Sequence, residues 1–464
     1  MHSKLFRMNR IILIGNGFDL AHDLKTSYKH FIDDYWKNKI DKVNDAINKN
    51  QAEFSDDDIY FNINNSVQLQ KNPVTFDGLM EFLDLRNFYA SQYKIGKGFA
   101  NTFLQDITAK MESLENWVDI EEEYNRLLNR LVIEENKKRS SNNNKSLDLL
   151  NNNGQIKILN KGLKILKEAL EKYLSNVTSN NTEKKANILQ NIYSEFELDD
   201  FTEKGKESVI KEQYSKILFY LEKYDKKELS SADVSERTIN FLRKIDIQCK
   251  RDEYSIKRLF VKESSSCHLL PSQMLFLNFN YTATEAVYYN HDTFEGTKNG
   301  YRKEFKIDKE TIHIHGEVEN KDNPIIFGYG DETGEEYVAM EKLNENEYLE
   351  HVKSIKYLET DNYKKMMHFI DSDLYQIFIF GHSCGISDRT LLKKLFENEN
   401  CVSIKPFYCI DENKKEENKD NYSDIVRNIS RNFENKTLMR EKVVNKKYCQ
   451  AFSIIPLKDK NLLI

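Results

Sequence analysis

The sequence is poor in cysteine, proline and glycine for its length. Among 464 residues there are 6 cysteines, 5 prolines and 16 glycines. The cysteines show no C-x-x-C pair and occur at positions 249, 267, 384, 401, 409 and 449. Neither a disulfide framework nor a zinc site is therefore predicted, and we expect reduced thiols that belong to the core.

The sequence also lacks a long apolar run and an excess of basic charge. Its 69 basic and 75 acidic residues give a formal net charge of -6, so no overall field attracts nucleic acid or an anionic membrane. The basic opening MHSKLFRMNR resembles a signal peptide, but the apolar run after it covers only Ile11 to Ile14. That is too short for a signal-peptide core or a membrane span. We expect a cytoplasmic protein without a membrane partner.

What the sequence does have is a strand, turn and helix pattern near its start. The run Ile11 to Ile14 leads into Gly15-Asn16-Gly17-Phe18-Asp19, and apolar residues then recur at helical spacing from Leu20 to Trp36. Leu20 stands where a dinucleotide fingerprint has its third glycine, which disfavours a Rossmann-type dehydrogenase. Two alternatives stay open: a turn that only joins a strand to a helix, and a turn whose free N–H groups bind a phosphate or ribose.

A long block without strand signals separates this start from the later apolar runs. Residues 37 to about 265 show helical spacing and little glycine or proline, whereas parallel strands are typically continuous Val, Ile, Leu or Phe runs. We predict an all-helical insertion over residues 37–265 that covers the crevice of the remaining chain. Residues 1–36 plus 266–464 are predicted to form an α/β, Rossmann-like domain with a mostly parallel sheet.

Short apolar runs return after residue 273, and polar or glycine residues close each of them. The closing segments are Asn280-Tyr281-Thr282, His313-Ile314-His315-Gly316, Gly328-Tyr329-Gly330 and Gly381-His382-Ser383. The carboxyl ends of parallel strands line one crevice. These residues are therefore predicted to share a site.

The segment Gly381-His-Ser383-Cys-Gly385 matches the G-x-S-x-G nucleophile elbow of α/β-hydrolases. The hydrolase triad runs serine, acid, histidine along the chain, and no histidine follows His382. This order argues strongly against a serine hydrolase. We predict instead that Ser383 lies in a turn that contacts a nucleotide, with Asp388 as a helix N-cap or a ribose contact.

His313 and His315 alternate on an apparent strand and are therefore expected to face the same side. Two imidazoles with a carboxylate such as Asp19 or Glu121 could bind a metal ion, which would suit a nuclease or nucleotide phosphohydrolase. We prefer a division in which His315, nearer the strand end, is catalytic and His313 is structural. A core role for both is the remaining alternative.

Taken in order, these motifs resemble the AbiH family of bacterial phage abortive-infection proteins. The similarity extends over the Gly15–Asp19 turn, Leu24-Lys-Thr-Ser27-Tyr28, Trp117-x-Asp-x-Glu121, Phe279-Asn280-Tyr281-Thr282 and Gly381-His-Ser-x-Gly-x-x-Asp388. The family looks like a distant relative of sirtuin-like NAD-consuming domains, where G-A-G-x-S, N-Y-D or N-I-D, H-G and G-x-S occur in the same order. Thr282 stands where the sirtuin pattern has an aspartate that helps to hold nicotinamide, and Asp19 where it has a small hydroxyl residue.

The resemblance implies an antiphage toxin that cleaves NAD at the nicotinamide N-glycosidic bond, with NAD as substrate and no metal or other cofactor. Asn280 and His315 fall on the catalytic asparagine and histidine. The residues expected to bind the nucleotide are Gly15, Asn16, Gly17, Phe18, Asp19, Tyr281, Thr282, Gly316, Gly381, Ser383 and Asp388. A phage component, a partner defence protein and a second copy of the chain are the further partners considered. The alternatives are a metal-dependent nuclease or phosphohydrolase and a non-catalytic nucleotide-binding sensor.

Overall fold

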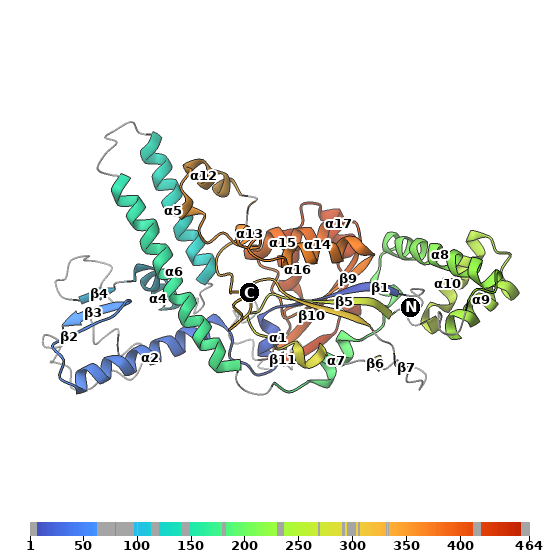
Figure 1. Ribbon diagram of the computed structural model, residues 1–464, viewed down its shortest axis with the longest axis horizontal. Helices are drawn as coiled ribbons and strands as arrows, with labels where there is room; N and C mark the ends of the chain where they lie inside the picture. Colours follow the sequence, from blue (N-terminus) through green and yellow to red (C-terminus); the bar gives the residue numbers. More distant parts are fainter. Residues whose placement is uncertain are drawn as a thin grey trace. The chain divides into compact units, whose positions relative to one another are not determined.

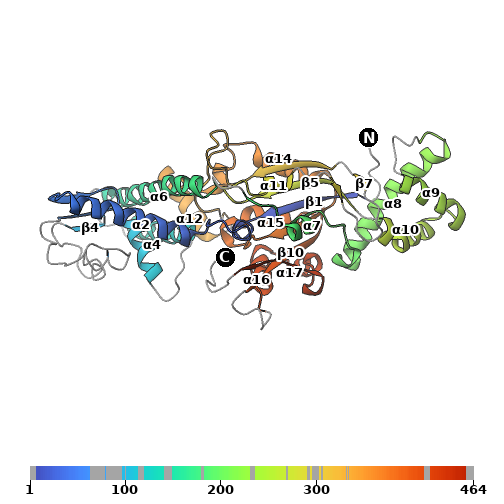
Figure 2. The ribbon, with the colours of Figure 1, turned by 90° about the horizontal axis from the view of Figure 1, so that it is seen from below.

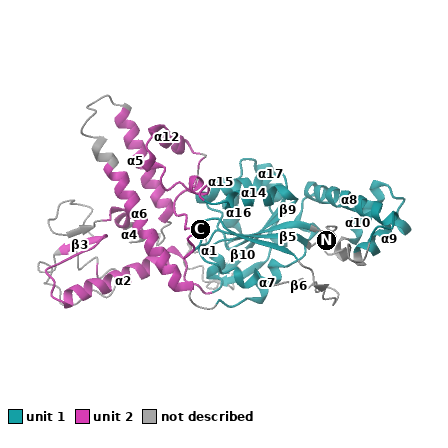
Figure 3. Cartoon of the chain, viewed as in Figure 1, with its two compact units in different colours: residues 1–22, 182–317, 360–464 teal, residues 23–181, 318–359 magenta. Residues whose placement is uncertain are grey.

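The computed structural model describes residues 7–62, 79, 97–99, 101–112, 120–140, 149–178, 182–229, 236–267, 270–289, 293–294, 303–304, 307–330, 332, 334–411 and 419–455. The chain forms two compact units (Figure 3). Unit 1 comprises residues 1–22, 182–317 and 360–464, and unit 2 comprises residues 23–181 and 318–359. The segment 37–265, predicted as one insertion, is thus divided between the units after residue 181.

Unit 1 is built on a six-stranded sheet in the order β11-β10-β9-β1-β5-β8, and all neighbouring strands are parallel (Figure 1). The strands are β1 (Arg7–Ile14), β5 (Leu270–Asn278), β8 (Asp308–His313), β9 (Tyr375–Phe380), β10 (Cys401–Asp411) and β11 (Ala451–Ile455). The predicted Rossmann-like α/β fold is confirmed. Ile11 to Ile14 are fully buried, because a parallel sheet is covered on both faces, and this burial explains the continuous apolar runs.

Alternation along the strands divides the core of unit 1 into two faces. Ile12 lies beside Phe276 and Phe378 in register, and these side chains pack in one cluster with residues of α1 (Asn16–Leu20), α7 (Ala186–Ile192) and α11 (Ala286–Tyr289). Neighbouring strand residues point to the opposite face. That face is covered by α14 (Asn362–Ser372) and α15 (Arg389–Glu397) (Figure 1).

A helical cluster packs at the amino-terminal side of the sheet in unit 1. It consists of α8 (Glu203–Asp225), α9 (Glu236–Gln248) and α10 (Glu253–Cys267), seen together in Figure 2. Its apolar residues share a core with Met8 of β1 and Val402 of β10. The other elements of unit 1 are η3 (Leu198–Asp200), β6 (Thr293–Phe294), β7 (Lys303–Glu304), η5 (Ile386–Asp388), α16 (Tyr422–Asn432), α17 (Lys436–Lys442) and η7 (Lys446–Tyr448).

Unit 2 is mostly helical but also holds a small antiparallel sheet. Its helices are α2 (Tyr28–Asn48), α4 (Thr102–Glu112), α5 (Ile120–Ser140), α6 (Leu149–Thr178), α12 (Glu335–Leu343), η4 (Asn346–Tyr348) and α13 (Lys353–Lys356). Strands β2 (Glu53–Ser55), β3 (Ile59–Asn62) and β4 (Lys97–Phe99) form the sheet. They correct the expectation that residues 37–265 are all helical, and with three or four residues each they are too short to produce a strand pattern.

The helix predicted from Leu20 to Trp36 is interrupted. α1 ends at Leu20, and Asp23 adopts a left-handed conformation with φ of 64°. α2 begins at Tyr28, after Ser27, whose Oγ accepts a hydrogen bond from the His30 N–H at 3.3 Å. Aspartate tolerates the left-handed region and serine is a favoured N-cap, so local turn and capping interactions override the apolar spacing. No helix in the described ranges is long and apolar enough to cross a membrane.

Candidate active site

The candidate site lies where the strand order of the sheet reverses. From β1 the chain proceeds to β5 and β8 on one side, whereas β9, on the other side of β1, is followed by β10. In open α/β sheets, ligands bind outside the carboxyl ends of the strands at such a point. Strands β1, β5, β8 and β9 end at Ile14, Asn278, His313 and Phe380, directly before the predicted site residues.

The glycine turn after β1 packs against the turn after β9. The Gly15 N–H donates to the Phe380 carbonyl at 3.1 Å, and the Gly17 N–H donates to the Gly381 carbonyl at 2.8 Å. Gly381 has a φ of +68°, and a Cβ there would lie 2.1 Å from the Phe18 nitrogen. Only glycine fits this position, because both the backbone angle and the space exclude a side chain.

This packing corrects one premise of the sequence analysis. The N–H groups of Gly15, Gly17 and Phe18 all donate to backbone carbonyls, so these three are not free to bind a phosphate. α1 is also only five residues long and provides little helix dipole. The glycines serve the close approach of two loops, and a nucleotide contact of the turn stays a prediction.

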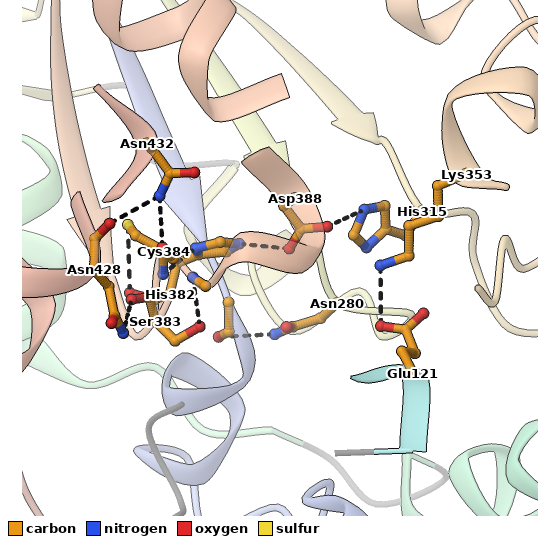
Figure 4. Close-up of polar contacts among 12 residues, drawn as sticks. Glu121, Asn280, His315, Lys353, His382, Ser383, Cys384, Asp388, Asn428 and Asn432 are labelled. Carbon is orange, nitrogen blue, oxygen red and sulfur yellow. Dashed lines mark hydrogen bonds and ion pairs between the residues drawn. The ribbon is translucent and has the colours of Figure 1, made fainter. Parts of the chain in front are cut away.

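Beyond the turn, Asp388 lies between two histidines (Figure 4). The Nε2 atom of His315 is 3.1 Å from Asp388 Oδ1, and the Nε2 atom of His382 is 3.6 Å from Asp388 Oδ2. Both histidine side chains are 5% exposed. The Phe279 ring packs edge-on against both imidazoles, with centroid distances of 5.1 and 4.4 Å. Asp388 occupies the predicted N-cap position of α15, but its carboxylate faces the histidines and makes no capping hydrogen bond.

His382 is oriented by the backbone of its own turn. The Cys384 N–H donates to His382 Nδ1 at 2.9 Å. In the neutral imidazole the proton therefore resides on Nε2, the nitrogen that faces Asp388. The Cys384 carbonyl in turn accepts a hydrogen bond from Asn432 Nδ2 at 2.7 Å, which fixes the turn. Sequence reasoning assigned no role to His382, and the only signal was a histidine directly after an apolar run and a glycine.

Ser383 is not arranged as a hydrolase nucleophile. Its Oγ accepts a hydrogen bond from the Gly385 N–H at 3.3 Å, and His382 faces Asp388 instead of the serine. The neighbouring Cys384 is fully buried, and burial, together with the charge of Asp388, raises the pKa of its thiol far above the ordinary range. A buried, protonated thiol is unreactive. The segment thus has the strand and turn of a nucleophile elbow, but His382 is not placed to activate Ser383.

A hydrogen-bond network holds the loop that carries Asn280. Asn278 Nδ2 donates to Glu285 Oε2 at 2.6 Å and to the Thr282 carbonyl at 2.9 Å. Asn278 Oδ1 accepts a hydrogen bond from the Asn280 N–H at 2.8 Å. Asn280 Nδ2 then donates to the Gly15 carbonyl at 3.0 Å. These bonds connect the end of β5, the loop and the glycine turn into one buried unit.

His313 belongs to this network, whereas the His315 imidazole faces Asp388. The Nε2 atom of His313 lies 2.9 Å from Glu285 Oε1. Burial alone would lower the pKa of His313, but the hydrogen bond and the charge of Glu285 raise it overall. The two histidines thus contact different carboxylates, an arrangement that suits different roles for them. Neither Glu285 nor Asn278 was predicted, because their function depends on contacts that no sequence spacing indicates.

Asp19 is buried with an incompletely satisfied carboxylate. Its Oδ2 accepts a hydrogen bond from Thr282 Oγ1 at 2.5 Å, whereas Oδ1 is buried and has no hydrogen-bond partner among the residues described. Burial raises the pKa of Asp19 to about 6, against the opposing hydrogen bonds of Thr282 and Thr284. Asp19 and Thr282 are the two positions that depart from the sirtuin pattern, and the structure pairs them with each other.

The candidate metal ligands do not form a cluster. Within the described ranges, no group of three or more His, Cys, Asp or Glu residues could hold a metal ion. Glu121 lies in unit 2, where it accepts hydrogen bonds from the Gly328 N–H and from Lys353 Nζ, both at 3.0 Å (Figure 4). The run predicted to end in a strand at Gly328 forms no strand of the sheet and also belongs to unit 2.

A family model described as bacteriophage abortive infection AbiH matches residues 11–410. The chain belongs to the AbiH family. The match includes Asn280, His315 and Asp388, and it indicates a role in abortive infection by bacteriophage. No curated protein matches the sequence. The similarity of AbiH proteins to sirtuin-like domains stays a prediction.

Proposed function

We propose that this AbiH-family protein acts in abortive infection by hydrolysing NAD at the nicotinamide N-glycosidic bond. The observation that carries the proposal is the convergence of Asn280 and the His315–Asp388 pair outside the carboxyl ends of the central strands. This edge of a doubly wound sheet is where nucleotides bind. The proposal places the reaction in the cytoplasm, where NAD is available.

The reaction breaks the bond between ribose C1′ and the nicotinamide nitrogen. The electron pair of that bond stays on nicotinamide, the oxygen of water bonds to C1′, and one proton is released. The transition state has oxocarbenium character, so the site needs a proton acceptor and a group that orients the attacking water.

His315 suits the role of proton acceptor. Its Nε2 faces Asp388 at 3.1 Å, which holds the ring in one orientation, and imidazole exchanges protons near neutral pH. Asn280 suits the orienting role. Its Nδ2 donates a hydrogen bond to the Gly15 carbonyl, and this bond fixes the side chain. Oδ1 can then accept a hydrogen bond from water or a ribose hydroxyl.

The Asp19–Thr282 pair supports a substrate that carries an amide. The sirtuin pattern places the carboxylate at the position of Thr282 and a hydroxyl at that of Asp19, and here the two groups are exchanged. The exchanged pair stays hydrogen-bonded at 2.5 Å, and Asp19 Oδ1 has no hydrogen-bond partner in the described part of the chain. A carboxamide N–H of nicotinamide would satisfy this oxygen, whose burial without a partner is costly.

The test is incubation of the purified protein with NAD, with and without a chelator. Release of nicotinamide that resists the chelator is expected. Turnover of another nucleotide or a nucleic acid that stops with the chelator would favour the metal-dependent alternative. Nucleotide binding without turnover would favour the sensor.

A further inference from the structure

Unit 2 contains a cavity that the proposed reaction does not use. Its volume is about 210 Å³. One wall is α5 and another is α12, and its floor is the bridge between Tyr329 and Val352. The residues that give it its chemistry are Asn125, Asn129, Tyr329, Tyr337, Met340 and His351.

Hydrogen bonds fix the frame of this cavity. The Tyr329 N–H donates to the His351 carbonyl at 3.1 Å, and the Lys353 N–H donates to the Tyr329 carbonyl at 2.9 Å. The Glu121 carboxylate of α5 accepts hydrogen bonds from Gly328 and Lys353 and so holds the same segment in place. A preformed frame lowers the ordering cost of binding a ligand.

His351 contributes an unused polar atom to the cavity. Its Nε2 is buried and has no hydrogen-bond partner among the residues that the structure describes. Glu350 Oε1 lies 3.9 Å away, beyond hydrogen-bond distance. Burial lowers the pKa of His351, so the imidazole is neutral at physiological pH. Its other ring nitrogen donates to the Phe327 backbone, so Nε2 offers an acceptor to a ligand.

Two asparagines on α5 supply further polar groups. Asn125 and Asn129 are four residues apart, so both lie on the helix face that lines the cavity. Each amide presents a donor and an acceptor side by side, which matches the edge of a nucleobase or of a carboxamide. Tyr329, Tyr337 and Met340 provide the apolar surfaces on which a flat ring packs.

Size and charge narrow the class of ligand. A cavity of roughly 150 Å³ binds benzene, so the larger cavity here accommodates a planar ring system with polar substituents. Glu336 is the one formally charged residue among the described residues that line the cavity, and these include no lysine or arginine. A phosphate would meet a carboxylate without a compensating cation, which is unfavourable.

We propose that this cavity binds a neutral nitrogen heterocycle with an amide-type edge. Nucleobases, nucleosides and free nicotinamide share this chemistry. For nicotinamide as the natural ligand, the inference rests on the proposed NAD hydrolysis, which would produce it. For a nucleobase or nucleoside it stands independently of that reaction.

The test is calorimetric titration of the full chain with adenine, adenosine, nicotinamide and AMP. At least one neutral compound is expected to bind saturably, and AMP is expected to bind at least about tenfold more weakly than adenosine. Asn129→Leu, which removes the amide at similar size, should weaken binding about tenfold or more. Arg130→Ala is the matched control on α5, because this side chain is 67% exposed and pairs with Glu134, so its binding should be unchanged.

Saturable binding by none of the neutral compounds would overturn the proposal, as would unchanged affinity in Asn129→Leu. Tyr337→Ala from α12 provides a second variant should Asn129→Leu fail to fold. His315→Ala distinguishes the cavity from the candidate active site at the sheet edge. The titration measures binding alone and does not require NAD hydrolysis. Binding that survives His315→Ala while NAD hydrolysis is absent in the wild type rejects the proposed function alone. Binding lost in His315→Ala but kept in Asn129→Leu assigns the ligand to the sheet edge and rejects the cavity.

Discussion

Glu121 in unit 2 and Asp19 in unit 1 are both buried carboxylates, and their surroundings differ. Glu121 is 3.0 Å from the Lys353 ammonium and 3.0 Å from the Gly328 N–H, and the Lys353 side chain is 1% exposed. Asp19 accepts a hydrogen bond from the Thr282 hydroxyl, and its pKa is raised to about 6 by burial. The Glu121 charge is compensated by the Lys353 ammonium. Asp19 has only a neutral hydroxyl as its hydrogen-bond donor at Oδ2, and its Oδ1 has no partner among the described residues. Perturbed, incompletely paired groups gather at functional sites, so we expect a structural role for Glu121 and a binding role for Asp19.

The largest expected effect on stability comes from breaking the balanced pair. Lys353→Met leaves the Glu121 charge buried and unpaired, so the free energy of unfolding should fall by about 3–5 kcal/mol. Urea unfolding measures this change. Adding Glu121→Gln to the same chain removes the charge and should restore part of the loss. A single variant as stable as the wild type would show that the pair is not structural.

Asp19→Asn should raise the free energy of unfolding at alkaline pH. Because its folded pKa of about 6 lies above the ordinary value of 3.8, the stability contributed by the protonated form is fully present below pH 3.8 and is lost as the pH rises through 6. At pH 8 the buried charge costs about 3 kcal/mol. The variant should therefore unfold at higher urea than the wild type at pH 8, with a gain that shrinks towards pH 4, and should bind NAD more weakly. Equal pH dependence in the two proteins would refute the assignment.

His382 offers a sharper test of the Asp388 arrangement, because two amide substitutions separate its two contacts. His382→Gln would keep a donor near Asp388, and His382→Asn would keep an acceptor for the Cys384 N–H. If His382 positions Asp388, His382→Asn should lower the kcat of NAD hydrolysis roughly tenfold with little change in KM, whereas His382→Gln should retain most activity. The reverse ranking would mean that His382 only supports its turn.

The smallest effect is expected at Ser383. Ser383→Ala removes one weak hydrogen bond from the Gly385 N–H, worth about 1 kcal/mol, and no catalytic group. NAD hydrolysis should stay within about threefold of the wild type, because the lost bond does not touch the reacting atoms. Complete loss of activity, with a covalent adduct on Ser383 in the wild type by mass spectrometry, would revive the serine hydrolase.

Sequence reasoning found the central sheet because burial on both faces forces continuous apolar runs. The same signal was misleading at Ile325, Ile326 and Phe327, which are buried in unit 2 without forming a strand of the sheet. An apolar run reports burial, and only the hydrogen-bond partners of the backbone decide between a strand and an irregular core segment. The strands β2, β3 and β4 were missed for the opposite reason, since they are too short to show a period.

The site could be predicted only in part. Asn280 and His315 were selected because they close apolar runs, and they do lie just beyond strand ends. Glu285, Asn278 and His382 were missed, because their contacts form within irregular loops and turns, whose geometry no sequence spacing indicates. Trp117 and Asp119, which belong to a motif shared with the AbiH family, lie outside the described residues.

The most direct test of the account is the NAD level in cells after induction of the wild type, His315→Ala and His313→Ala. The wild type should deplete NAD, and His315→Ala should slow the loss by about 10²-fold or more, because it removes the proton acceptor. His313→Ala removes the imidazole that contacts Glu285 and, among the described residues, leaves only the Asn278 hydrogen bond to this buried carboxylate, so the variant should melt at a lower temperature yet still deplete NAD. Thermal melts of each purified protein control for folding. Depletion by folded His315→Ala at the wild-type rate would contradict the account.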